Sequence, residues 1–223
     1  VMIATGVYVE AHKVDKTYVI GSKVISLTKD KPNIVKICGN TRSLQVGRDW
    51  YLPTFVIEAE DEEWIRNFGE FVQALHSDER RTVGICFGHQ MIAQTLGGEV
   101  CRSERGWGIG VQQMSIAEEQ PWMRPPMDSC RMLFTHQDQV EVLPSGARLL
   151  GSTEHCPNAM FAVDDHILSI QAHPEYSRPY LRALIESREA IIDPITFKAG
   201  LASLEMEHHR SEMAQWLRHF LQG

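Results

Sequence analysis

Apolar residues recur along this chain in two ways, as short runs rich in β-branched residues and as longer stripes at helical spacing. One stripe between residues 64 and 75 predicts a helix whose start is marked by acidic residues at 61–63. Apolar runs at 55–57 and 82–85 flank this stripe and predict buried strands. A further apolar helix face begins near Met91 and ends at the glycine pair 97–98. This alternation predicts an α/β protein with parallel strands.

The pattern of apolar residues changes between residues 99 and 163, where short apolar runs are separated by turn segments that contain proline and glycine. These runs, at 108–114, 130–134, 139–143, 147–152 and 159–163, predict antiparallel β structure beside the main sheet. A buried strand is predicted again at 167–171, and apolar stripes at 180–185 and 213–221 predict C-terminal helices. The first part of the chain is rich in β-branched residues at 1–9, 17–27 and 33–38, which predict strands without a helix between them.

Length, composition and charge narrow the class of protein. A chain of 223 residues with 43% hydrophobic and 23% charged residues suits one soluble globular domain over residues 1–223. The net charge of −7, without a dense basic run, argues against a nucleic-acid groove and favours a small metabolite as partner. An odd number of cysteines, five, without a C-x-x-C pair or a zinc-like cluster, indicates free thiols in a reducing cytoplasm. Because no window approaches about 18 apolar residues, we expect no membrane span.

The strongest local pattern lies at residues 83–90, where a short apolar strand leads into a cysteine between two glycines and then into a helix. The arrangement G-x-C-x-G is the thiol counterpart of a nucleophile elbow, in which small neighbours permit a tight strand-to-helix turn. A thiolate at a helix N-terminus is stabilised by unpaired N–H groups, and the N–H of Phe87 faces the oxyanion formed during attack. We therefore expect Cys86 to be a nucleophile, against the alternative of a buried cysteine that acts as a small hydrophobe.

A nucleophilic cysteine needs a base, and His173 is the best placed of ten histidines. It ends the apolar strand at 167–171, and only Pro174 separates it from the carboxylate of Glu175. If the strands that end at Ile85 and Ala172 are neighbours, these groups form a triad of nucleophile, imidazole and orienting acid. Taken singly, a strand-end histidine that caps backbone groups and a solvated glutamate would be the ordinary interpretations.

Two motifs give the chain a family resemblance. Residues 84–90 (GICFGHQ) and 171–177 (QAHPEYS) resemble the class I glutamine amidotransferases. Residues 106–110 and 136–140 between them resemble the stand-alone, GMP-synthase-like subgroup that includes γ-glutamyl peptidases. The resemblance implies a flavodoxin-like three-layer sandwich with a mainly parallel central sheet, an added antiparallel segment and C-terminal helices. It also implies no cofactor and the triad Cys86, His173 and Glu175.

The same resemblance assigns roles around the triad. Gln90 and the backbone at Phe87 would hold glutamine or a γ-glutamyl group. Apart from the resemblance, we expect His136 and Gln137 to lie in a loop that shapes the substrate pocket, with a second base as the alternative role for His136. The oxyanion hole would combine the N–H of Phe87 with a second donor at Gly21, although Gly21 lies farther from the first helix than in relatives.

Three functions remain open at this point. The first is glutamine hydrolysis that releases ammonia for a separate synthase subunit, which is needed because the sequence has no G-x-x-x-x-G-K-[ST] loop for ATP. The second is hydrolysis of γ-glutamyl peptides through the same thioester. The third, from another class, is a catalytically inactive binding or regulatory module that retains the elbow.

Overall fold

The computed structural model describes residues 62–223 continuously, and before them the backbone of seven short strands. The N-terminal strands agree in part with the β-branched runs, whereas the run at 55–57 lies outside the described residues. These strands are β1 (Met2–Ile3), β2 (Val7–Ala11), β3 (Lys16–Ile20), β4 (Lys23–Leu27), β5 (Lys31–Val35), β6 (Leu44–Val46) and β7 (Asp49–Tyr51).

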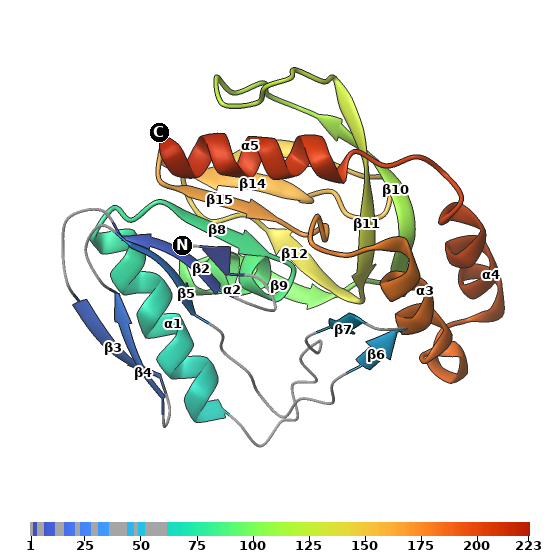
Figure 1. The fold of residues 1–223 in the computed structure, drawn as a ribbon, viewed down its shortest axis with the longest axis horizontal. Coiled ribbons are helices and arrows are strands. Elements are labelled where there is room, and N and C mark those ends of the chain that lie inside the picture. Colours follow the sequence, from blue (N-terminus) through green and yellow to red (C-terminus); the bar gives the residue numbers. More distant parts are fainter. Residues whose placement is uncertain are drawn as a thin grey trace.

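From residue 62 onward the order of elements follows the predicted pattern, with strand β9 and helix α4 as additions that were not predicted (Figure 1). The first unit is α1 (Glu62–Ser77), β8 (Thr82–Ile85) and α2 (Phe87–Thr95). The β-rich part contains β9 (Glu99–Arg102), β10 (Gly108–Ile116), β11 (Ser129–His136), β12 (Asp138–Val142), β13 (Arg148–Ser152), β14 (Met160–Val163) and β15 (Ile167–Ile170). The C-terminal part contains α3 (Arg178–Glu186), a 3-10 turn (Glu189–Ile191), α4 (Pro194–Ser203) and α5 (Arg210–Gln222).

The central sheet has nine strands in the order β11-β10-β13-β14-β15-β8-β1-β2-β5. Its parallel pairs are β15 with β8 and β8 with β1, and its other neighbours pair antiparallel. The α/β, flavodoxin-like class is thus confirmed, but parallel pairing is confined to the strands beside β8, whereas we expected a mainly parallel sheet. The reason is that β10 to β15 are joined by turns and loops rather than by crossover helices.

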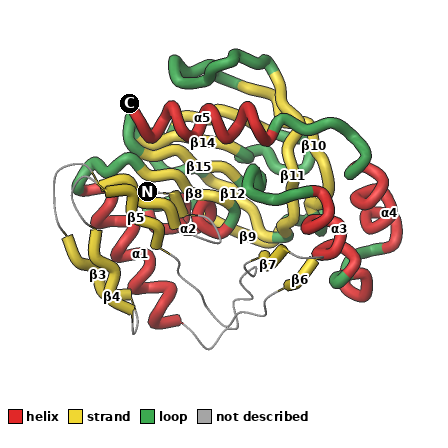
Figure 2. Tube along the Cα trace, in the orientation of Figure 1, coloured by secondary structure: helices red, strands yellow, loops and turns green. Residues whose placement is uncertain are grey.

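Side chains point alternately to the two faces of the sheet, and helices pack on both faces to give three layers. On β8, Val83 and Ile85 face the cluster that contains α5, while Thr82 and Gly84 point to the opposite side, toward α2. On β14, Phe161 and Val163 join α1 and α2, so that these helices cover one face and α5 covers the other (Figure 2). The apolar stripe predicted for α1 is confirmed by its buried side chains, Phe68, Phe71, Val72 and Leu75.

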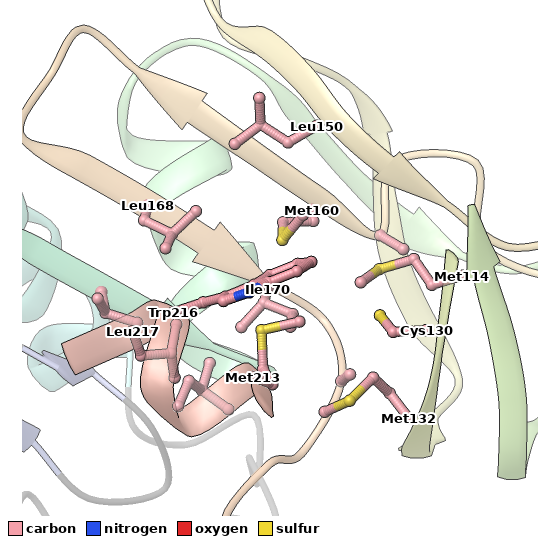
Figure 3. Packing of buried hydrophobic residues seen from close by; sticks show 14 of the residues in the cluster. Met114, Cys130, Met132, Leu150, Met160, Leu168, Ile170, Met213, Trp216 and Leu217 are labelled. Atoms are coloured by element: carbon pink, nitrogen blue, oxygen red, sulfur yellow. The ribbon is translucent and has the colours of Figure 1, made fainter. Parts of the chain in front are cut away.

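The face under α5 holds the largest cluster of buried residues (Figure 3). Trp216 is fully buried there, and its indole N–H donates to the carbonyl of Pro125 at 2.8 Å. This hydrogen bond satisfies the polar atom of an otherwise apolar side chain, as buried tryptophans require. The stripe predicted near the C-terminus is therefore the element that closes this side of the sheet.

Helices α3 and α4 lie beside β10 and β11 at one end of the molecule (Figure 1). All four residues predicted to form the stripe of α3 are buried, Tyr180, Leu181, Leu184 and Ile185. Their burial fixes the segment that follows β15, and this segment carries His173 and Glu175. Within the described part of the chain, no helix is both long enough and apolar enough to cross a bilayer.

Candidate active site

The predicted elbow is present at the junction of β8 and α2. Cys86 has φ 51° and ψ −103°, a positive φ that a residue with a Cβ rarely adopts. Gly84 makes this turn feasible, because a Cβ there would lie 2.8 Å from the carbonyl oxygen of Gly88 and 2.5 Å from the Cδ1 of Ile92. The backbone of the strand thus approaches the backbone of the helix more closely than any side chain allows.

Parallel pairing brings the second motif to the elbow. Ile85 is paired with Ile170, and the N–H of Cys86 donates to the carbonyl of Ile170 at 2.9 Å. Both strands end at the same edge of the sheet, where ligands of α/β proteins bind. The assumption that the two motif strands are neighbours is therefore confirmed, and residues 171–175 follow directly beside Cys86.

His173 and Glu175 form a close pair. The Nδ1 atom of His173 lies 2.7 Å from the Oε1 atom of Glu175. Since a carboxylate only accepts hydrogen bonds, Nδ1 carries the proton and Nε2 is left to exchange a proton with a neighbouring thiol. The ring is fully buried and stacks in parallel on Tyr176, with centroids 4.0 Å apart. Glu175 keeps 31% of its side chain exposed.

The protonation state of His173 depends on Cys86. Burial alone lowers the pKa of the ring, but the charge of the Cys86 thiolate and that of Glu175 oppose it and raise the pKa to about 10. Nε2 has no hydrogen-bond partner of ordinary geometry among the described residues, although Cys86 stands close enough to raise the pKa of the ring. Poorly aligned hydrogen bonds of this kind are common in catalytic pairs before substrate binds. The arrangement favours a protonated ring at His173.

A chain of amide hydrogen bonds also reaches the sulfur. Gln90 donates through Nε2 to the carbonyl of Asp138 at 2.6 Å and to the Oε1 atom of Gln171 at 3.2 Å. Gln171 in turn donates through Nε2 to the Sγ atom of Cys86 at 3.5 Å. The expected contact of Gln90 with substrate stays a prediction, because its donors are directed to protein acceptors here. Sequence reasoning missed Gln171, although it stands two residues before His173.

His136 is buried beside the site and is held neutral. Its pKa lies well below 6.5, first because of burial and then because of the neighbouring His155, His173 and His89. Its ring packs edge-on against His155, with centroids 5.5 Å apart. Neither ring nitrogen has a partner among the described residues, and so the expected role in the pocket remains a prediction.

Gln137 points elsewhere. The surrounding hydrogen-bond network orients its amide oxygen toward Arg102, at 3.1 Å from Nε and 2.7 Å from the second terminal nitrogen. Its predicted role in substrate binding would therefore require this pair to open.

The structure adds a cation that the sequence motifs did not indicate. Arg188, just after α3, is half-buried and lies over the ring of Trp107 at 5.2 Å. Its guanidinium donates to the hydroxyl of Thr135 at 2.8 Å. Burial lowers the pKa of Arg188, while groups that include Tyr176 and Cys86 raise it, so that this cation lies within electrostatic range of the sulfur. No carboxylate within the described residues forms an ion pair with it.

The predicted oxyanion donors are the backbone N–H groups of Phe87 and Gly21. Phe87 is the first residue of α2, where backbone N–H groups lack intrahelical acceptors, and its ring stacks on Phe68 at 5.9 Å. Gly21 lies outside the described residues. Both roles remain predictions.

Three thiols away from the elbow, all in the described part of the chain, are poor nucleophiles. Burial raises the pKa of both Cys130 and Cys156 to about 12. Partial burial and the surrounding carboxylates raise the pKa of Cys101 as well. A thiol that keeps its proton attacks carbonyl carbon slowly, which leaves the elbow as the reactive position among these cysteines.

Comparison with known proteins identifies the family. Residues 60–186, more than half of the chain, match the family described as glutamine amidotransferase class-I. The chain belongs to this family. The match spans the elbow, the β-rich segment and the histidine motif.

Named relatives come from two groups. The chain is 35% identical to γ-glutamyl peptidase 3 of Arabidopsis thaliana over 132 residues, 56% of this chain and 53% of the relative. It is 38% identical over 96 residues to one subunit of the glutamine-hydrolyzing GMP synthase of Methanoculleus marisnigri, 43% of this chain and 52% of that relative. The match thus spans about half the length of each relative.

Solved structures support the fold. A glutamine amidotransferase from Thermotoga maritima superposes with a TM-score of 0.59 and 23% identity, over 77% of this chain and 74% of that one. A second, from Methylobacillus flagellatus, gives a TM-score of 0.60 with 19% identity, over 75% and 73%.

Proposed function

We propose that this amidotransferase hydrolyses the side-chain amide of glutamine through a γ-glutamyl thioester on Cys86. One observation carries the proposal, namely the meeting of a strained elbow thiol with a buried, carboxylate-paired imidazole at the ends of neighbouring parallel strands. A nucleophile, a proton carrier and an orienting acid in this order are what acyl transfer requires.

The residues divide the reaction between them. The Cys86 thiolate attacks the amide carbon, and the oxyanion that forms is stabilised by the N–H of Phe87 at the start of α2. His173 gives its proton to the departing nitrogen as the carbon–nitrogen bond breaks and ammonia leaves. Water then loses a proton to His173 and attacks the thioester, which releases glutamate and restores the thiolate. Glu175 keeps the ring oriented throughout.

Arg188 supplies a recognition element for the substrate. A γ-glutamyl group carries an α-carboxylate, and a half-buried guanidinium near the sulfur, with no carboxylate partner in the described part of the chain, is suited to bind it. Trp107 and Thr135 hold the side chain in place before substrate arrives. The proposed substrate is thus any γ-amide of glutamate with a free α-carboxylate.

A second candidate is hydrolysis of γ-glutamyl peptides. The similarity to γ-glutamyl peptidase 3 favours it, and the same thioester forms whichever amine leaves. Under the first candidate the ammonia passes to a separate synthase subunit, as the similarity to a GMP synthase subunit suggests.

The decisive experiment compares ammonia release from glutamine with amine release from γ-glutamyl dipeptides. We expect Cys86→Ser to abolish turnover of the preferred substrate and Cys101→Ser to retain it. A glutamine-like electrophile followed by mass spectrometry should place one adduct on Cys86. Absence of turnover with both substrates, together with absence of an adduct, would instead establish a non-catalytic module.

Substrate recognition is tested with Arg188→Met. Loss of a hydrogen bond to a charged group costs about 1.5–3 kcal/mol, and KM should therefore rise about 10- to 100-fold with a smaller change in kcat. The matched control is Arg182→Met on α3, an exposed arginine paired with Glu205 at 2.8 Å, which should leave KM unchanged. An analogue with an α-carboxamide should be a poor substrate for the parent, and Arg188→Met should no longer distinguish it from glutamine. Discrimination that survives in the variant would contradict the assignment.

A further inference from the structure

A second cluster of ligating side chains lies at the other end of the same strands. His76 is in the last turn of α1, and Asp164 and His166 are in the turn between β14 and β15. The turn is tied to β8, because the N–H of Thr82 donates to the carbonyl of His166 at 2.7 Å. Cys86 follows the carboxyl end of β8, and so this cluster and the elbow occupy opposite edges of the sheet.

The geometry brings three ligand atoms together. The Nδ1 atom of His76 lies 2.9 Å from the Nε2 atom of His166, and the two rings are nearly coplanar, 21° apart. A carboxylate oxygen of Asp164 completes a group whose ligand atoms all lie within 4.8 Å of one another. With one proton shared between them, the two imidazoles form a hydrogen bond that a metal ion can replace.

The separation of the nitrogens indicates the type of ion. At metal–nitrogen distances of about 2.0–2.1 Å, two nitrogens 2.9 Å apart subtend about 90° at the metal. Such an angle suits the tetragonal or octahedral arrangements that Ni²⁺ and Cu²⁺ prefer with nitrogen and oxygen ligands. A tetrahedral Zn²⁺ site would require the nitrogens to part by about half an ångström. In either case the rings turn so that their lone pairs point at the ion.

The charges around the cluster favour a cation. The carboxylates of Asp164 and Glu79 both lie within electrostatic range of the His166 ring. Arg148 forms ion pairs with Glu118 at 3.2 Å and with Asp165 at 3.5 Å, and within the described residues no ion pair engages the side chain of Asp164.

We propose that His76, Asp164 and His166 form a binding site for a divalent transition-metal ion, with water in the remaining coordination positions. The site joins the end of α1 to the turn before β15, two elements that are far apart in sequence. It takes no part in the thioester chemistry, and its presence does not depend on the proposed function.

The experiment uses the tag-free chain in the Cys86→Ser background, so that metal bound to the elbow thiol does not contribute. Calorimetric titration with Ni²⁺ should give one site, and His76→Ala or His166→Ala should weaken binding at least tenfold. Asp164→Asn should weaken it less, and the neighbouring Asp165→Asn is the matched control that should bind as the parent does. With Cu²⁺, the electron paramagnetic resonance spectrum should show coupling to two imidazole nitrogens in the parent and to one in either histidine variant.

Two results would overturn the proposal. One is the absence of Ni²⁺ binding by the folded parent at millimolar concentration. The other is an affinity that is unchanged in the double variant His76→Ala, His166→Ala, because the metal would then be bound elsewhere. Circular dichroism of each variant separates loss of ligands from loss of folding, and Asp164→Asn tests the site without removing the contact between the rings.

Discussion

Replacing Cys86 with serine should lower the pKa of His173 from about 10 toward its ordinary value of 6.5. The difference between these values corresponds to about 5 kcal/mol in favour of the charged ring. Burial works against the charge, and so the thiolate and Glu175 together must supply more than this amount. Serine is neutral and nearly isosteric with cysteine. The substitution therefore removes the charge that contributes most to raising the pKa of His173, while Glu175 remains.

The assay is an NMR titration of chain labelled with ¹⁵N in its histidines, in which the signal of His173 is identified by its absence in His173→Gln. In the parent the ring should hold its proton through neutral pH and lose it only near pH 10. Turnover should decline over the same range, because the leaving nitrogen then receives no proton from the ring. Cys101→Ser, on β9, should titrate as the parent does. A ring that still titrates near pH 10 in Cys86→Ser would refute the thiolate–imidazolium pair.

Three further changes probe the frame around this pair. Gly84→Ala should lower the free energy of unfolding, measured in urea, by about 1–3 kcal/mol, because the added methyl group meets fixed backbone. The control is Gly69→Ala in α1, where the nearest atom would be 3.4 Å away and the free energy of unfolding should stay the same or rise by up to about 1 kcal/mol. Equal effects of the two substitutions would contradict the reasoning. Glu175→Gln should reduce kcat about 100-fold or more and lower the pKa of His173, whereas a lower kcat with unchanged titration would deny the pairing. Gln171→Ala should slow iodoacetamide labelling of Cys86 about tenfold at neutral pH with KM for glutamine unchanged, and an unaltered labelling rate would remove Gln171 from the site.

The elements with a clear apolar period were predictable. The stripe of α5 follows the sequence, and the elbow was recognisable because its glycines satisfy a steric demand that few other sequences meet. Helix α4 escaped because only Gly200 of its residues is fully buried and its apolar face is narrow, with Phe197 and Leu201 partly buried against the core. Its start did carry a signal in Asp193, whose side chain accepts from the N–H of Thr196 at 2.9 Å ahead of a proline at the first turn.

Site residues were predictable from the sequence only where a local motif marks them. The positions of Cys86 and His173 depend on one pair of adjacent strands, which the apolar runs already indicate. Arg188 reaches the site through packing of α3 against β10 and β11, and nothing local distinguishes it from a surface arginine. The metal cluster has the same difficulty, since His76 and His166 are 90 residues apart. Sequence alone cannot predict such groups, because they form a site only when elements that are distant in the chain pack together.

The short parallel pair formed by β8 and β15 also fixes the distance between the proposed metal site and the elbow. Because Ile167 pairs with Thr82, the level of His166 lies five residues before Cys86, and five residues of strand span about 16 Å. A paramagnetic ion held by His76 and His166 would broaden NMR signals of the elbow with a steep dependence on distance. Movement of Cys86 on substrate binding would then be measurable without any label inside the active site.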